Sequence, residues 1–237
     1  MSRLSLSALL LLFSWLAEGQ LIVNGSLNDF YDDFKTARMM DRHRHEETVE
    51  GSPYDLEKFT SGDIRLANQQ QYSGIPMNYN IYSGQVEFIN DKGDNMVFDI
   101  PEMIEFVVIG QEKYIYSPYS MGGKIFKGFF VVLEEGAALL LQKKNVMLKP
   151  AESPQAYKDA VPARFVRTRD DFYLRIPPSE AKKVANRKDL DEALPAVPPE
   201  LDQFIRRENI RFNRKEELVK LVAEYNRLAG LQPGTGG

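Results

Sequence analysis

The chain has 237 residues, of which 43% are hydrophobic, a formal net charge of −4 and no cysteine. The lack of cysteine excludes disulfides, thiol catalysis and thiolate metal sites, and the acidic balance disfavours nucleic acid as a partner. The length predicts one domain of moderate size, with at most a small appendage.

Residues 1–19 have the pattern of a secretory signal peptide. A basic start precedes an apolar run from Leu4 to Ala17, and a small-x-small cleavage site ends at Gly19. The run is shorter than the roughly 20 residues that a membrane-spanning helix requires. We therefore expect an exported protein with no membrane span after cleavage, and the missing cysteines favour a bacterial periplasm or outer surface.

Residues 20–61 form a polar N-terminal segment in which one helix is expected. Phe30 and Phe34 keep a helical spacing, and Asp29 can cap a helix that extends to roughly Glu47. We expect this helix to be partly docked on the rest of the protein.

The only two histidines, His43 and His45, lie in the expected helix. Residues two apart point away from each other on a helix, and a typical transition-metal site needs three converging ligands. A Ser-His-Asp triad would need one of them, and no nucleophile elbow is present. Gly122-Gly123-Lys124 lacks the Ser or Thr of a phosphate loop and precedes an expected strand. We predict no metal, no cofactor and no enzymatic activity.

Residues 62–178 are predicted to form an antiparallel β domain, because short runs of Val, Ile, Phe and Tyr alternate with turn residues. The expected strands are Asp63–Leu66, Asn78–Tyr82, Gln85–Ile89, Met96–Ile100, Ile104–Ile109, Lys113–Tyr116, Ile125–Leu133, Ala137–Gln142 and Phe172–Ile176. Short links make neighbouring strands antiparallel. The predicted fold is α+β and mainly β: a curved antiparallel meander sheet with C-terminal helices packed on it.

The stretch Met77–Phe88 predicts a two-sided hairpin, in which a two-residue loop pairs position 82 with 85 and position 79 with 88. One face then carries Tyr79, Ile81, Val86 and Phe88, and the other carries Asn78, Asn80, Tyr82, Gln85 and Glu87. This sorting predicts one face on the core and one face open to water or a partner. Asn80 and Tyr82 are therefore candidate binding residues.

Tyr114, Tyr116 and Tyr119 are the other candidate binding residues. A tyrosine can pack its ring and keep its hydroxyl wet, which suits a protein interface or a sugar-stacking surface. Ordinary half-buried sheet packing is the leading alternative, because tyrosine is a favoured strand residue.

Two later stretches predict opposite environments. Residues 128–141, GFFVVLEEGAALLL, are apolar on both faces and should form the most buried hairpin. The stretch Lys149–Asp171 has no periodicity and contains three prolines, so we expect a long surface loop.

Residues 179–229 are predicted to form the C-terminal helical segment, and residues 230–237 a flexible tail. The expected helices extend from Ser179 to about Leu194, from Glu200 to Glu208, and from a capping box of Asn213 and Glu216 to Ala229.

Three motifs carry a resemblance to known proteins: GSPYDLEKFTSGDIRL at residues 51–66, IPMNYNIYSGQVEF at residues 75–88 and IRRENIRFNRKEELVKLVAEYN at residues 205–226. In their order and character they resemble exported envelope proteins of Bacteroidetes-type bacteria. The resemblance implies the periplasm or outer-membrane surface of a Gram-negative bacterium and a non-catalytic role. No activity is attached to that group, so no functional residue carries over.

Together these features predict a non-enzymatic cell-envelope protein that acts in binding or assembly through contacts with another envelope protein. The expected contact surface is the polar face of the Met77–Phe88 hairpin or the Lys149–Asp171 loop. The alternative is a module that binds a glycan or small ligand through Tyr114, Tyr116 and Tyr119, and a hydrolase with an unrecognised site ranks third.

Overall fold

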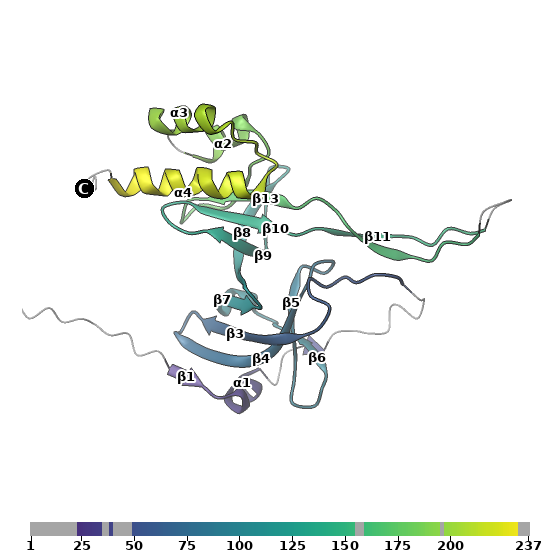
Figure 1. The fold of residues 1–237 in the computed structure, drawn as a ribbon. Helices are drawn as coiled ribbons and strands as arrows, with labels where there is room; N and C mark the ends of the chain where they lie inside the picture. Colours follow the sequence, from purple (N-terminus) through teal and green to yellow (C-terminus); the bar gives the residue numbers. More distant parts are fainter. Residues whose placement is uncertain (1–22, 35–37, 40–48, 155–158, 195–196, 232–237) are drawn as a thin grey trace, which may run out of the picture.

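Figure 1 shows the computed structural model of the protein, which describes residues 23–34, 38–39, 49–154, 159–194 and 197–231. The predicted signal peptide and both histidines, His43 and His45, lie outside the described residues. Within the described ranges, no helix has the length and apolar character needed to cross a membrane.

The N-terminal half is built mainly from strands. These are β1 (Val23–Gly25), β2 (Arg38–Met39), β3 (Thr60–Leu66), β4 (Gln70–Asn80), β5 (Gln85–Ile89), β6 (Asn95–Val97) and β7 (Ile104–Ile109). The helical elements are α1 (Leu27–Asp33) and the 3₁₀ turn η2 (Pro101–Met103). α1 begins before the predicted helix because Ser26 and Asp29 form a capping box. The prediction that this helix continues to Glu47 is wrong, because α1 ends at Asp33 and Arg38 and Met39 form a strand.

The C-terminal half combines strands with helices. The strands are β8 (Glu112–Met121), β9 (Lys124–Glu134), β10 (Leu139–Lys143), β11 (Val146–Lys149), β12 (Arg164–Arg167), β13 (Asp171–Arg175) and β14 (Lys182–Lys183). The helices are α2 (Arg187–Ala193), α3 (Pro199–Glu208) and α4 (Lys215–Leu231). Figure 1 shows α2, α3 and α4 together on one side of the β8–β10 and β13 region.

The main sheet has the strand order β14-β13-β10-β9-β8-β7-β3-β4-β5-β6-β2, and β1 adds to β4 in parallel. All pairs along that order are antiparallel. The predicted mainly β, α+β class with C-terminal helices is thus confirmed. β7 returns to pair with β3 instead of β6, so two meanders join at the β3–β7 pair.

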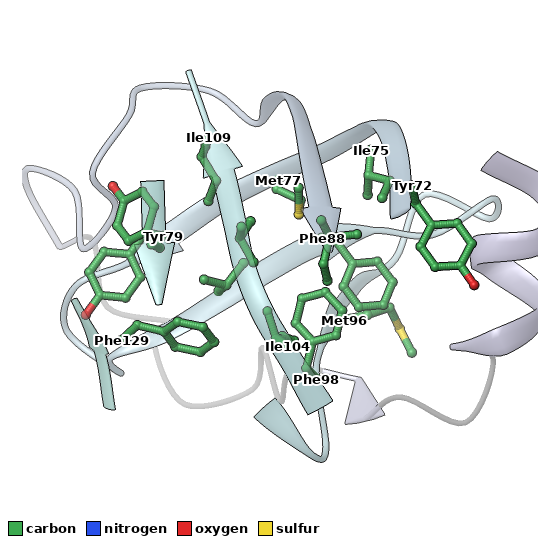
Figure 2. Packing of buried hydrophobic residues seen from close by; sticks show 14 of the residues in the cluster. Tyr72, Ile75, Met77, Tyr79, Phe88, Met96, Phe98, Ile104, Ile109 and Phe129 are labelled. Atoms are coloured by element: carbon green, nitrogen blue, oxygen red, sulfur yellow. The ribbon is translucent and has the colours of Figure 1, made fainter. Parts of the chain in front are cut away.

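The long β8–β9 hairpin separates two parts of the hydrophobic core. Tyr114 and Phe129 lie on one face, in the cluster with β3–β7 that Figure 2 shows. Tyr119 and Phe130 lie on the other face, against β10 and β13. Leu140 and Leu141 of β10 are fully buried in different clusters, so the hairpin predicted to be buried on both faces is confirmed.

The β4–β5 hairpin forms as predicted, but its register and its exposure differ. The pairs are Met77↔Phe88, Asn78↔Glu87, Tyr79↔Val86 and Asn80↔Gln85, so the loop spans residues 81–84. A shift of two positions leaves each strand residue on its predicted face. The polar face is nevertheless buried, including Asn78 and Glu87. The prediction of a wet face is wrong because residues 52–57, here called the cover segment, lie over it: Leu56 N–H donates to Asn78 Oδ1.

The predicted surface loop Lys149–Asp171 is partly a two-stranded arm. β11 pairs with β12, and Glu152 bridges to Val161 beyond them. The arm extends away from the body in Figure 1. The base of the arm is held next to the cover segment, because Glu50, two residues before that segment, exchanges backbone hydrogen bonds with residues 163 and 165.

The first predicted C-terminal helix starts later than expected. Asn186 caps α2, whereas the stretch before it contains β14 and Ala181, which hydrogen-bonds to the backbone of β8. The strand pairing satisfies backbone groups that a helix from Ser179 would have satisfied internally. α3 and α4 agree with the predicted second and third helices. The predicted start of the tail at residue 230 is wrong, because the helical backbone of α4 continues to Leu231.

Candidate functional site

Asn80 lies in a buried polar cluster instead of facing solvent. Its amide donates to Glu87 Oε1 at 2.8 Å, and the hydroxyl of Tyr54 donates to Glu87 Oε2 at 2.8 Å. Asn95 Nδ2 donates to the same carboxylate at 3.1 Å. Buried polar groups joined in this way hold a backbone in place, so Asn80 anchors the cover segment rather than presenting a binding group.

The candidate tyrosines do not share one exposed surface. Tyr114 and Tyr119 are buried on opposite faces of β8, and Tyr116 is half-buried against Phe129 with ring centroids 5.0 Å apart. The three rings therefore offer no common platform for a sugar. Tyr82 is 51% exposed and packs edge-on against Phe165 at the base of the arm.

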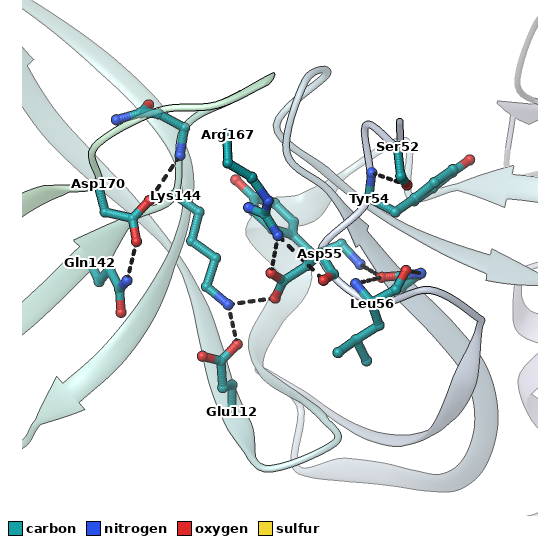
Figure 3. A network of polar contacts seen from close by, with 12 residues as sticks. Ser52, Tyr54, Asp55, Leu56, Glu112, Gln142, Lys144, Arg167 and Asp170 are labelled. Carbon is teal, nitrogen blue, oxygen red and sulfur yellow. Dashed lines mark hydrogen bonds and ion pairs between the residues drawn. The ribbon is translucent and has the colours of Figure 1, made fainter. Parts of the chain in front are cut away.

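A second polar cluster connects the cover segment to the rest of the protein, and Figure 3 shows it centred on Asp55. The Asp55 carboxylate accepts hydrogen bonds from Lys144 Nζ at 2.5 Å, Tyr114 Oη at 2.6 Å and Arg167 Nη2 at 2.7 Å. Glu112 accepts a further bond from Lys144 Nζ at 2.5 Å. The cluster joins β8, the β10–β11 link and β12, and its two cations face two carboxylates.

The pKa values in this cluster follow from burial and pairing. Burial by itself would raise the pKa of Asp55, but the hydrogen bonds from Lys144, Tyr114 and Arg167 outweigh it and lower the pKa to about 2. Burial, and then the hydrogen bond to Asp55, raise the pKa of Tyr114 far above its ordinary value. The Asp55 carboxylate is thus ionised and the Tyr114 phenol neutral at physiological pH. Neither group changes its protonation state near neutral pH, as is typical of a cluster that stabilises the fold.

The accessible feature near the predicted tyrosines is the turn between β8 and β9. Gly122 and Gly123 occupy it with φ of 58° and 75°, a conformation that glycine adopts without strain. Met121, Ile125 and Phe126 beside the turn are 55%, 67% and 39% exposed. We call these three side chains the apolar tip.

The apolar tip stands on a well-packed base. The ring of Phe126 lies 5.8 Å from the ring of Tyr119, which also contacts Phe130 and Tyr173. Lys143 Nζ lies 4.2 Å from the centre of the Tyr119 ring. Tyr119, a predicted binding residue, therefore supports Phe126, whereas Ile125 pairs with Ser120 and lies on the opposite face of the hairpin.

A pocket of about 370 Å³ adjoins the tip at Ser120, Met121 and Gly122. Charged side chains of both signs line it: Asp171, Lys182, Lys183, Asp189 and Glu192. Two lysines are already engaged, since Lys183 pairs with Asp171 at 2.6 Å and Lys182 donates to the Glu192 carbonyl at 2.9 Å. Apolar side chains next to charged groups of both signs are typical of a protein-binding surface.

The apolar tip was not predicted from the sequence, because Gly122-Gly123-Lys124 was considered only as a phosphate-binding loop, whose motif it does not match. The signal was present: a glycine pair between alternating strands, with large apolar residues on both sides of it. What could not be predicted is that Met121, Ile125 and Phe126 are left exposed by the rest of the fold.

Among the described residues, no three His, Cys, Asp or Glu side chains are grouped so as to hold a metal ion. Comparison with protein-family models, with curated proteins and with solved structures finds no match to the chain.

Proposed function

We propose that the protein is a non-enzymatic binding or assembly component of the bacterial cell envelope that holds a partner protein through the apolar tip. The observation that supports this function is the exposure of Met121, Ile125 and Phe126 together on one tight turn. Grouped large apolar side chains on a surface are typical of interaction sites. The envelope location rests on the sequence of residues 1–19 and on the resemblance to exported envelope proteins.

The surroundings of the tip favour a protein partner over a lipid surface. Lys124 and Lys127 flank the tip, but Lys127 is paired with Glu102, and the adjoining pocket carries three carboxylates beside two lysines. These surroundings lack the excess of positive charge that would attract an anionic membrane. A protein surface can match both signs of charge around an apolar contact.

The tip has the character of a small set of binding anchors. Phe126 and Met121 lie on the face of the hairpin that Tyr119 supports, and Ile125, paired with Ser120, projects from the opposite face at the same turn. In a small set of exposed apolar side chains bordered by polar groups, few residues carry most of the affinity. Truncating one anchor should therefore weaken binding by about 1–2 kcal/mol, which is roughly 5- to 30-fold.

In-cell photo-crosslinking tests the proposal. A photo-reactive residue is placed at Ile125, and at Arg207 of α3, whose side chain is 68% exposed, as the matched control. Crosslinked products are purified and identified by mass spectrometry. The proposal expects one abundant protein adduct from position 125 that is absent from position 207.

The double variant Ile125→Ser, Phe126→Ser provides the second arm. It should keep the far-UV spectrum of the native protein and lose the partner from co-purification. Equal adducts from positions 125 and 207, or unchanged co-purification of the double variant, would refute the tip as the contact. Association of the native protein, but not the double variant, with phosphatidylglycerol vesicles would replace the protein partner with a membrane.

A further inference from the structure

A second pocket, of about 320 Å³, borders the β3–β7 core at Phe34 and Leu66. It is formed where α1 ends, at the β3–β4 turn, and at the stretch that leads into η2. It shares no lining residue with the apolar tip or the pocket beside it. Its size suits a single long side chain or a small ligand.

The inner wall of this pocket is apolar and well supported. Leu66 is almost fully buried, and the ring of Phe34 lies 4.8 Å from Phe30 and 5.2 Å from Phe98. Such packed rings keep their position without a ligand. The wall is therefore a preformed surface, and little free energy is needed to order it when a ligand binds.

The rim of the pocket exposes apolar side chains to solvent. Ile100 is 58% exposed and Met103 is 46% exposed, and both line the pocket. They account for two of the exposed large apolar side chains of the described residues, and a ligand with an aliphatic chain would cover them. This argues for a ligand that is apolar along part of its length.

The polar lining of the pocket is negative. Asp33 and Asp99 contribute carboxylates, and none of the described lining residues is basic. Asp33 accepts a hydrogen bond from the Tyr72 hydroxyl, whereas Asp99 makes no hydrogen bond or ion pair with any described residue. The remaining polar lining groups are the neutral amides of Asn68 and Gln70. A cation would complement the two carboxylates of this described lining.

We propose that this pocket binds an alkylammonium or guanidinium group, supplied by a lysine or arginine side chain of a peptide. Its aliphatic stem would lie on Ile100 and Met103, and its cation would meet Asp33 and Asp99. Lysine and arginine side chains combine an apolar stem with a charged end in this way, and a carboxylate is the strongest hydrogen-bond acceptor available to that end. A free alkylamine has the same chemistry and would use the same contacts.

Binding of defined probes to the whole protein tests this site. The probes are a blocked Gly-Lys-Gly peptide, the same peptide acetylated on the lysine amine, and butylamine. The methyl NMR signal of Met103 reports occupancy of the pocket. The proposal expects a saturable shift with the lysine peptide and none with the acetylated peptide, which keeps the stem but loses the charge.

Single variants locate the cation. Asp99→Asn should weaken binding of the lysine peptide about two- to fivefold, the scale of an ion pair at an exposed carboxylate. Asp99 is exposed and unpaired among the described residues, so this change should leave the fold intact. Glu200→Gln on α3 makes the same change in net charge at a remote exposed position and should leave binding unchanged.

The relative affinities of the probes distinguish a peptide ligand from a free alkylamine. Tighter binding of the peptide than of butylamine supports a peptide, and equal binding supports the same site with a free amine. No saturable shift, equal binding of the acetylated peptide, or equal weakening by Glu200→Gln would overturn the site. None of these outcomes depends on the apolar tip, so the two proposals fail separately.

Discussion

Replacing Asp55 with asparagine should destabilise the protein by about 2–3 kcal/mol at neutral pH. The Asp55 side chain is 6% exposed and accepts hydrogen bonds from Lys144, Tyr114 and Arg167. Its pKa is lowered from 3.8 to about 2, and at about 1.4 kcal/mol per tenfold change in acidity this corresponds to roughly 2–3 kcal/mol. Asparagine keeps the shape but removes the charge that the two cations require.

The stability that Asp55 contributes should depend on pH. A carboxylate whose pKa is lower in the folded state contributes its full stability above the unfolded pKa, and loses it as pH falls through the folded pKa. For Asp55 this window lies between 3.8 and about 2. The difference in unfolding free energy between native protein and Asp55→Asn should therefore be constant from pH 7 to about 5 and shrink below about 4.

Urea denaturation at a series of pH values measures this difference, with Glu135→Gln as the control. Glu135 pairs with Lys113 at 2.7 Å, but its side chain is 52% exposed, so its loss should cost less than about 1 kcal/mol. A cost below about 1 kcal/mol for Asp55→Asn, or a difference that stays the same from pH 7 to pH 3, would refute the account of the cluster.

Three further changes test other parts of the structure. Gly62→Ala should cost at least about 2 kcal/mol in thermal or urea unfolding, because its Cβ would lie 2.5 Å from the Val108 carbonyl oxygen; full native stability would contradict the close β3–β7 approach. Asn226→Ala should cost about 1–3 kcal/mol and speed hydrogen exchange in α4, because the amide bonds both backbone groups of Ala138 at 2.8 and 3.0 Å; unchanged exchange would argue against this helix–sheet link. Ile125→Ser should shift the unfolding midpoint by less than the equivalent of about 0.5 kcal/mol, and a larger loss would mean that the tip is buried.

Local sequence patterns determined most of the strands and their order of appearance. Gln85–Ile89 and Ile104–Ile109 are predicted with the bounds that the structure has, because each is a short run of strand-favouring residues closed by turn residues. The alternation in the Met77–Phe88 stretch also assigned side chains to the correct faces. These features depend only on neighbours along the chain.

Only the tertiary structure decided which faces of the strands are exposed to solvent. The alternation that separates Asn78 and Asn80 from Tyr79 cannot reveal that Leu56, 22 residues away from Asn78, covers the polar side. The arm was missed for a related reason, since prolines hide the pairing of Val146–Lys149 with Arg164–Arg167 and that pairing joins segments distant in sequence. Burial depends on contacts between distant segments, which no local pattern contains.

The candidate sites follow the same division. The sequence alone determined that the chain has no cysteine and only two histidines, and these facts by themselves limit the chemistry that its side chains can perform. Only the tertiary structure decided that Tyr114 is a buried anchor of Asp55 while Ile125 is exposed. Both residues lie on expected strands with similar local patterns, and what separates them is whether another part of the chain reaches that point of the β8–β9 hairpin.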